Sequence, residues 1–415
     1  MKRFKKDKQY YKFCAYGFLK NLRFFEPFLI IIFRYTGFSF LQIGILYSVK
    51  EIFTNVFEIP TGIIADSYGR RLSMIFSFIA YIVSLLIFYF FPYYKFYLAA
   101  MILFAIGEAF RTGTHKAMIL EYLKLNNMKE LKVYYYGSTR SCSQLGSALS
   151  SLIAAFIVFV NSNYRLIFLF TIIPYVMELF LMISYPKELD GDIKKVSGKT
   201  VLSGFWVKIK NTLYDFIGVV KNKEVIKTMF NASLFDAFFK TVKDYIQPVI
   251  KNTVLAGSML AALSPDKRVA VLIGCVYFVL YLLTSFASRN SGAVVSKINS
   301  ISKSMNITFL TGALFLALIG LFYVNKLYVV TVIVFVLYYM LQNIRRPIVV
   351  GFISDLIKSR VMATGLSVES QLKTLLIALM SPLLGFMADK LGLGTAIMVF
   401  GIIYLVSYLF TKVND

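Results

Sequence analysis

Long apolar stretches recur along the whole chain and constrain its fold more than any other feature. Each holds about 20 residues, enough for a helix to cross a hydrocarbon core of roughly 30 Å. Of the 415 residues, 58% are hydrophobic and 16% are charged, whereas about a quarter of an average soluble domain is charged. A transmembrane β-barrel would show short alternating segments instead. The sequence therefore predicts an all-α polytopic membrane protein.

Twelve transmembrane helices are predicted, in two groups of six. Their approximate ranges are 11–34, 39–60, 72–92, 96–117, 134–160, 164–185, 225–250, 268–288, 304–324, 327–348, 363–387 and 393–411. A long polar segment separates the groups, so we expect an N-terminal bundle (1–185), a cytoplasmic linker (186–224) and a C-terminal bundle (225–415). Parallel six-helix halves of this kind are a plan found among secondary transporters.

The basic residues predict the orientation of the chain. Its formal net charge is +24, and most Lys and Arg fall in segments that this arrangement places in the cytoplasm. The first eight residues alone contain Lys2, Arg3, Lys5, Lys6 and Lys8. We therefore expect a multi-pass protein of the cell membrane with both termini in the cytoplasm. One outer loop, with Lys251, Lys267 and Arg268, departs from the pattern.

The second part of the linker has the pattern of an amphipathic helix. Apolar residues recur at helical spacing from Leu202 to Val220, with polar residues on the other faces. The only tryptophan, Trp206, lies on the apolar face. This pattern predicts a helix that lies on the cytoplasmic membrane surface. A helix that binds a partner protein is the alternative.

A polar segment, 58–71, separates the second and third spans. Pro60 lacks an N–H group and Gly62 tolerates unusual backbone angles, so we expect the second helix to stop there. Asp66 and the pair Arg70–Arg71 then place fixed charges at the membrane edge. A turn with solvated charges would explain this composition.

A weaker copy of the segment follows the eighth span, at Gly292-Ala293-Val294-Val295-Ser296. Ser296 stands where Asp66 would stand, and Ser300 where Arg70 would. The copy has lost the charges, but its place supports a duplication that gave two pseudo-symmetric halves.

The segment Gly62-Ile63-Ile64-Ala65-Asp66-Ser67-Tyr68-Gly69-Arg70-Arg71 resembles the signature G-x-L-A-D-x-x-G-R-R/K of the major facilitator superfamily of secondary transporters, with Ile64 in place of Leu. The resemblance extends to the twelve spans, the two halves and the long central loop. It implies two pseudo-symmetric six-helix bundles and a cytoplasmic gate. The gate residues would be Gly62, Asp66, Gly69, Arg70 and Arg71.

The resemblance also implies a partner for Asp66, the N-terminus of the eleventh helix, which begins near Met362. A carboxylate there gains about 0.3–1 kcal/mol. Other family signatures are missing. In the fourth span, Arg111 stands only two residues before Gly113, which departs from the R-x-x-x-G of many proton-coupled drug exporters. The antiporter pattern of the fifth span and the sugar-porter signatures are not evident.

Ionisable residues inside the spans each cost about 2.5–3.5 kcal/mol on insertion scales, so each needs a partner or a role. The resemblance implies that helices 1, 4, 7 and 10 line a central cavity, and most of these residues fall on them. Helical spacing places Arg23 with Glu26, Glu108 with Arg111 and His115, and Asp236 with Lys240 and Asp244, each set on one face. The predicted substrate-binding and coupling residues are Arg23, Glu26, Glu51, Glu108, Arg111, Asp236, Lys240, Tyr339 and Gln342. Charge pairs that only neutralise each other and hold helices together are the alternative.

A carboxylate in a cavity of low dielectric constant can carry a proton. The candidates, in order of preference, are Glu26, Glu51, Glu108 and Asp236. The chain has one histidine and three scattered cysteines, and no glycine-rich nucleotide loop or Ser/His/Asp arrangement. We therefore expect no enzyme activity, no metal site and no cofactor.

These features predict a transporter that moves a small polar or amphiphilic organic solute by alternating access. Coupling to protons is expected, and export is favoured over import. The mixed buried charges suit a charged or zwitterionic solute better than a neutral sugar. The expected partners are the solute, protons and the lipid bilayer, with no nucleic acid, and the protein is expected to be a monomer. The alternatives are an importer of the same fold and a membrane receptor or sensor that does not transport.

Overall fold

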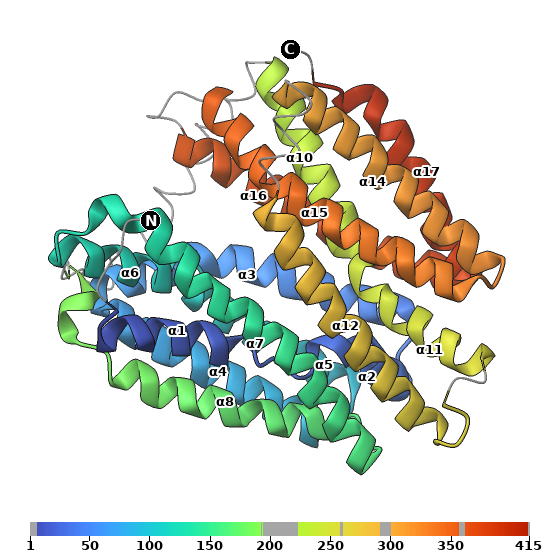
Figure 1. Cartoon of the computed structure of the whole chain (residues 1–415), viewed down its shortest axis with the longest axis horizontal. Coiled ribbons are helices and arrows are strands. Elements are labelled where there is room, and N and C mark those ends of the chain that lie inside the picture. Colours follow the sequence, from blue (N-terminus) through green and yellow to red (C-terminus); the bar gives the residue numbers. More distant parts are fainter. Residues whose placement is uncertain are drawn as a thin grey trace. The chain divides into compact units, whose positions relative to one another are not determined.

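The computed structural model describes residues 6–191, 193, 223–257, 260–290, 300–356 and 362–413. These residues form helices joined by short connections, and they include no strand (Figure 1). Two predicted features, the amphipathic helix 202–220 and the weak motif copy 292–296, lie outside the described residues.

The helices follow the order of the twelve predicted spans. Spans one to six are α1 (Lys8–Lys20) with η1 (Glu26–Phe28) and α2 (Leu29–Tyr35), α3 (Phe40–Tyr68), α4 (Arg70–Phe90), α5 (Tyr94–Arg111) with α6 (Thr114–Leu125), α7 (Lys132–Asn161) and α8 (Leu166–Ile183). Spans seven to twelve are α10 (Lys223–Val242) with η4 (Lys243–Tyr245) and α11 (Ile246–Ala256), α12 (Pro265–Arg289), α14 (Ile301–Val324), α15 (Tyr328–Leu356), α16 (Met362–Leu391) and α17 (Leu393–Thr411). The short helices η2 (Lys129–Leu131) and η3 (Lys187–Asp190) precede α7 and follow α8.

By length and composition, nine helices in the described part of the chain are able to cross a membrane. The first, second and seventh predicted spans fall outside this set. The first and seventh are divided into shorter helices, and α3 carries Lys50 and Glu51 in its middle.

The chain forms two compact units. Unit 1 comprises Met1–Phe28 and Val49–Val207, and unit 2 comprises Leu29–Ser48 and Lys208–Asp415. Since the boundary passes through the first span and through α3, the first turns of α3 belong to unit 2. The division expected from the sequence, 1–185, 186–224 and 225–415, stays a prediction.

Aromatic side chains fill the core of each unit. In unit 1 the ring of Tyr81 lies 5.3 Å from that of Tyr175, centroid to centroid. In unit 2 the rings of Phe238 and Tyr404 stack at 4.3 Å. Each ring buries a large apolar area, so the polar groups described below lie in an otherwise apolar interior.

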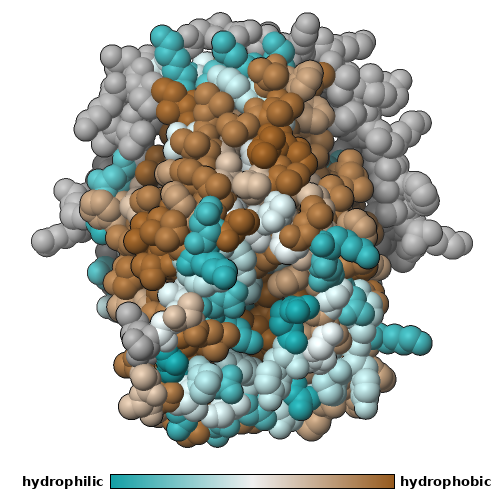
Figure 2. All heavy atoms as spheres, turned by 90° about the vertical axis from the view of Figure 1, so that its right-hand side faces the viewer, coloured by the Kyte–Doolittle hydropathy of each residue, from teal (hydrophilic) through white to brown (hydrophobic). Residues whose placement is uncertain are grey.

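Large apolar side chains are also exposed at the surface. Phe156, Phe180, Leu409 and Phe410 each expose two thirds or more of their area, at 67%, 69%, 76% and 75%. On the face shown in Figure 2, hydrophobic side chains form large areas between separate groups of hydrophilic ones. Soluble monomers rarely expose apolar patches of this extent, so this surface suits contact with lipid.

The second span does not stop where we expected. α3 continues through Pro60 and Gly62 to Tyr68, so the predicted stop is wrong. The hydroxyl of Thr61 donates to the carbonyl of Phe57 at 2.7 Å. Proline is found within transmembrane helices where other groups satisfy the backbone carbonyl that it leaves unpaired. The turn is instead Gly69, with φ at +100°.

Three spans expected as continuous helices are interrupted. The first unwinds over residues 21–25, just before Pro27. The fourth breaks at Thr112 and Gly113, where φ of Gly113 is +80°. The seventh changes to the 3-10 helix η4 shortly before Pro248. Pro27 and Pro248 lie in the first turn of the helical segment that follows each break, where proline is best tolerated, and Gly113 supplies the positive φ of the fourth break. Because each break divides a span, the expected faces shared by Arg23 with Glu26, Glu108 with His115, and Asp236 with Asp244 are wrong.

Candidate functional site

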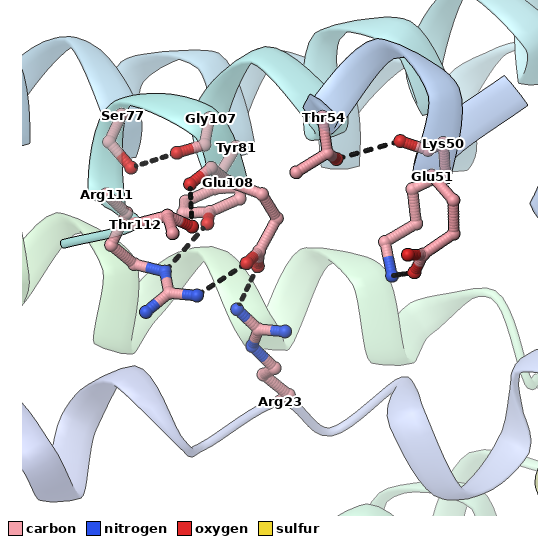
Figure 3. Close-up of polar contacts among 10 residues, drawn as sticks. All are labelled: Arg23, Lys50, Glu51, Thr54, Ser77, Tyr81, Gly107, Glu108, Arg111 and Thr112. Atoms are coloured by element: carbon pink, nitrogen blue, oxygen red, sulfur yellow. Dashed lines mark hydrogen bonds and ion pairs between the residues drawn. The ribbon is translucent and has the colours of Figure 1, made fainter. Parts of the chain in front are cut away.

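A buried charge cluster lies in unit 1, where α5 faces the unwound part of the first span. The carboxylate of Glu108 accepts hydrogen bonds from Arg23 and from Arg111, the latter at 2.5 Å. Nε of Arg111 donates to the hydroxyl of Tyr81 at 3.1 Å. Figure 3 shows the two guanidinium groups pointing toward the single carboxylate between them.

The local backbone explains why Arg23 reaches this cluster. It follows the end of α1, in the segment that has lost its helical hydrogen bonds, so its side chain leaves the backbone where no helix face constrains it. Nε of Arg23 is buried without a hydrogen-bond partner among the described residues. Discontinuous helices of this kind are a common way to build a solute site within a membrane.

The cluster carries more positive than negative charge. Two guanidinium groups share one carboxylate, and the side chains of Arg23, Glu108 and Arg111 are only 15%, 13% and 18% exposed. Guanidinium groups bind carboxylates and phosphates through paired hydrogen bonds. The cluster is therefore able to bind a negatively charged group of a solute.

The other two predicted site residues of unit 1, Glu26 and Glu51, lie on η1 and α3. Glu26 is half-buried in η1. Glu51 pairs with its neighbour Lys50, with 3.9 Å between Nζ and Oε1, and Figure 3 shows this pair apart from the Glu108 group. The structure therefore brings together Arg23, Glu108 and Arg111, and not the whole predicted set.

Unit 2 has a second polar cluster, between α10, α15 and α16. Nε2 of Gln342 donates to Oδ1 of Asp236 at 2.9 Å, and Nζ of Lys373 lies 3.9 Å from Oδ2. Lys373 also lies 3.6 Å from Glu369. The cluster has two carboxylates and one ammonium group, the opposite charge balance to that in unit 1.

The remaining predicted residues of unit 2, Lys240 and Tyr339, lie on α10 and α15 as well. The hydroxyl of Tyr339 donates to the carbonyl of Lys243 at 3.1 Å, and Lys240 is exposed. Asp244 pairs with Lys243 at 2.6 Å in η4.

In the predicted gate segment, Arg71 has a partner that is distant in sequence. Nε of Arg71 donates to Oδ2 of Asp190 at 2.9 Å, and its backbone N–H donates to Oδ1 at 2.8 Å. Because Arg71 lies in the first turn of α4, Asp190 places a carboxylate at the N-terminus of that helix. Arg70 lies 3.7 Å from Glu121 of α6.

The glycines and the aspartate of the gate segment differ in their surroundings. A Cβ atom on Gly69 would lie 2.9 Å from Cγ of Asp190, and its positive φ is difficult for any other residue. At Gly62 a Cβ atom would meet no described atom within 4 Å. Asp66 is exposed on the last turns of α3. Its predicted contact with the start of the eleventh helix stays a prediction.

Two buried charged residues were not predicted. Glu178 of α8 is fully buried, and neither carboxylate oxygen has a hydrogen-bond partner among the described residues. The sequence held a signal, because Glu178 is the one charged residue in α8. Arg345 of α15 is 1% exposed and, among the described residues, forms no ion pair.

The guanidinium of Arg345 is held by neutral groups. Nη1 donates to the carbonyl of Met305 at 2.6 Å and to the hydroxyl of Thr308 at 2.5 Å, and Nη2 donates to the side chain of Asn231. Its Cζ atom lies 4.5 Å from the ring centre of Phe235. A role in the packing of unit 2 explains these contacts.

A metal centre finds no support in the described part of the chain. No three side chains of His, Cys, Asp or Glu come together there as metal ligands would. Cys14, Cys142 and Cys275 are free thiols.

Comparisons with known proteins identify a family that this chain matches. The family model described as Major Facilitator Superfamily matches residues 13–369. An uncharacterized MFS-type transporter of Bacillus subtilis (strain 168), YxaM, is 32% identical over 104 residues. That match covers 25% of this chain and 26% of the relative.

Solved structures of transporters share the fold. A mutant form of the nucleoside transporter NupG aligns with a TM-score of 0.77, over 97% of this chain and 99% of that one, at 12% identity. A D-xylose-proton symporter aligns with a TM-score of 0.68, over 98% and 96%, at 14% identity. A POT family transporter in complex with 5-aminolevulinic acid aligns with a TM-score of 0.68, over 97% and 93%, at 14% identity. These alignments show a common twelve-helix fold.

Proposed function

The chain belongs to the Major Facilitator Superfamily, and from that premise we propose that it carries a negatively charged or zwitterionic small organic solute across the cell membrane by alternating access, coupled to protons. It is a multi-pass membrane protein of a family of transporters rather than enzymes. The solute class, the coupling ion and the mechanism are the parts that we propose.

The observation that carries the solute class is the Arg23–Glu108–Arg111 cluster. Two guanidinium groups around one carboxylate leave hydrogen-bond capacity for a further anionic group. Within unit 2 alone, the carboxylates of Asp236 and Glu369 suit a cationic group, so solutes that carry such a group belong in the test. Neutral sugars would need amide and aromatic groups more than charges.

A screen of solutes against the full-length protein tests this proposal. Thermal unfolding is followed in detergent with three matched sets of solutes: organic anions, zwitterions, and neutral nucleosides or pentoses. A ligand that binds only the folded state raises the unfolding temperature with its concentration. We expect stabilisation by members of the first two sets, and Arg23→Gln to abolish it. Arg289→Gln, at an exposed position at the end of α12, is the control.

Stabilisation by the neutral set alone, or an equal response in Arg23→Gln and the wild type, would contradict the proposed solute class. Transport would then be tested with the neutral compounds that bind.

Proton coupling rests on the carboxylates near the membrane interior, with Glu26 as the first candidate. Repeating the assay at two pH values shows whether solute binding and proton binding are linked. We expect Glu26→Gln to remove the pH dependence of solute binding while binding itself persists. A pH dependence that survives this change would assign the proton to Glu51, Glu108 or Asp236.

We propose that the protein exports its solute. We also propose that both termini lie in the cytoplasm, because most basic residues fall in the segments on that side. Cells that express the protein should accumulate less of the solute than cells that express Asp66→Asn. Higher accumulation in the wild type would instead identify an importer of the same fold.

A further inference from the structure

A buried carboxyl group of unit 1 has no part in the site described above. Glu178 of α8 is 0% exposed, and neither of its oxygens has a hydrogen-bond partner among the described residues. Tyr175 and Met182, on the same face of α8, are also fully buried. A carboxylate in this place loses its hydration without a compensating hydrogen bond, so burial favours the neutral, protonated form.

Two cationic groups act against this effect of burial. In the described part of the chain, the ammonium group of Lys20 in α1 attracts the ionised carboxylate most, followed by the guanidinium of Arg111 in α5. The phenol groups of Tyr16 and Tyr185 also interact with Glu178. The other helices that pack against α8, α4 and α7, add no described charged group that acts on it. Burial and charge therefore oppose each other, and this balance suits a group that binds and releases a proton.

Lys20 connects Glu178 electrostatically with the Arg23–Glu108–Arg111 cluster. Its ammonium group is attracted by both carboxylates, Glu108 and Glu178, and repelled by both guanidinium groups. Tyr16, one turn before Lys20, likewise interacts with Arg111, Glu178 and Glu108. All of these residues belong to unit 1. The charge of Glu178 therefore acts on the cluster.

The charge balance around the cluster depends on the proton of Glu178. When Glu178 is neutral, one carboxylate, that of Glu108, lies among three cationic groups. These are the side chains of Lys20, Arg23 and Arg111. When Glu178 is ionised, a second carboxylate offsets part of this positive charge. An anionic group would bind more tightly beside neutral Glu178, and its binding would in turn favour protonation, because coupling between two sites is reciprocal.

We propose that Glu178 is a proton-binding residue of unit 1, and that its proton binds together with an anionic group at the Arg23–Glu108–Arg111 cluster. Solute and proton then cross the membrane together, so export is driven by the gradient of the solute. The proton site itself needs no solute, but its part in transport rests on the proposed function. Glu178 adds a site to the candidates for the proton named above.

Infrared spectroscopy of the full-length protein in nanodiscs tests the proton site without a solute. A protonated carboxyl group has a C=O stretching band that is separate from the bands of a carboxylate. We expect a component of this band at neutral pH that disappears at alkaline pH and is absent from Glu178→Gln at every pH. Glu188→Gln, at an exposed position in η3, is the control and should keep the component.

Two further variants test the link to the cluster. Lys20→Gln removes a charge that favours the ionised carboxylate, so the component should persist to higher pH, with a proton affinity raised about tenfold or more. Arg111→Gln should act in the same direction, because it reproduces the neutralisation of this guanidinium by a bound anion. Lys95→Gln, at an exposed position at the start of α5, should leave the pH dependence unchanged.

The same band in Glu178→Gln as in the wild type, or a component that does not change with pH while the protein stays folded, would overturn the proton site. An equal pH dependence in the wild type, Lys20→Gln and Arg111→Gln would overturn its link to the cluster. If the band behaves as expected but no anion stabilises the protein in the thermal screen, the proton site stands and the proposed function fails. If anions stabilise the protein but Glu178→Gln does not change the band, the proton site fails alone.

Discussion

At the scale of single residues, two buried glutamates of unit 1 differ in their partners. Glu108 accepts from Arg23 and Arg111, whereas neither oxygen of Glu178 has a partner among the described residues. Removing one partner of a buried ion pair leaves an uncompensated charge, which costs about 3–5 kcal/mol. Glu178 forms no such ion pair among the described residues, although it attracts the ammonium group of Lys20, so its replacement should cost less.

The same substitution should therefore have different effects at the two sites. We expect Glu108→Gln to lower the thermal unfolding temperature strongly, because two guanidinium groups lose their shared carboxylate. Glu178→Gln should leave the temperature unchanged or raise it. Thermal unfolding of the purified variants measures both, and equal losses would show that Glu178 has a stabilising partner.

The guanidinium of Arg345 gives a second prediction at this scale. Lysine would keep the charge of Arg345 but lose the planar fork that reaches Met305, Thr308 and Asn231 together. We expect Arg345→Lys to lower the unfolding temperature well below that of Arg289→Lys, which changes an exposed arginine. Similar unfolding temperatures for the two variants would show that the hydrogen bonds of the Arg345 guanidinium do not stabilise the packing of unit 2.

At the scale of helices and turns, the gate segment is a sharp turn built on one glycine. Gly69 has a positive φ and lies against Asp190, while Gly62 lies in the interior of α3 with no described atom near its missing side chain. A strained backbone conformation costs about 1–3 kcal/mol in a residue other than glycine. Glycine in a helix interior costs about 0.5–1 kcal/mol relative to alanine.

Alanine should thus have opposite effects at these two glycines. We expect Gly69→Ala to destabilise the protein by about 1–3 kcal/mol, with displacement of Asp190 from the start of α4. Gly62→Ala should be neutral or stabilising. Thermal unfolding in detergent compares them, and a loss at Gly62 equal to that at Gly69 would argue against the observed end of α3.

The positions of the spans could be predicted from the sequence, but their interruptions could not. Apolar stretches of about 20 residues identify spans wherever they fold. Proline, by contrast, has two outcomes here: α3 continues through Pro60 beside the Thr61 hydroxyl, whereas the first span unwinds before Pro27. Local sequence does not distinguish these cases, because neighbouring helices determine whether an interrupted backbone is stable.

The candidate site was predictable only in part for the same reason. Glu108 and Arg111 are close in sequence, so their pairing followed from helical spacing. Arg23 joins them from a segment that was expected to be helical, and Arg71 binds Asp190 across 119 positions. Such contacts depend on how helices pack, and a single sequence carries no record of that.

At the scale of the whole molecule, the family and the twelve-helix plan were predicted correctly from the apolar spans and the segment 62–71. The gate role of that segment stays a prediction. We expect Asp66→Asn to reduce the rate of solute transport while the unfolding temperature stays near that of the wild type. Reconstituted flux and thermal unfolding, measured on the same preparation, check the two parts separately. Unchanged flux would remove the gate role.

Proton movement driven by solute tests the central claim most directly. The protein is reconstituted in vesicles that contain a pH-sensitive dye, and a solute identified by the thermal screen is added on one side. We predict a change of internal pH that requires both the protein and the solute and that is slowed by Asp66→Asn. Solute flux without any movement of protons would contradict the proposed coupling, and the absence of both would contradict the proposed transport.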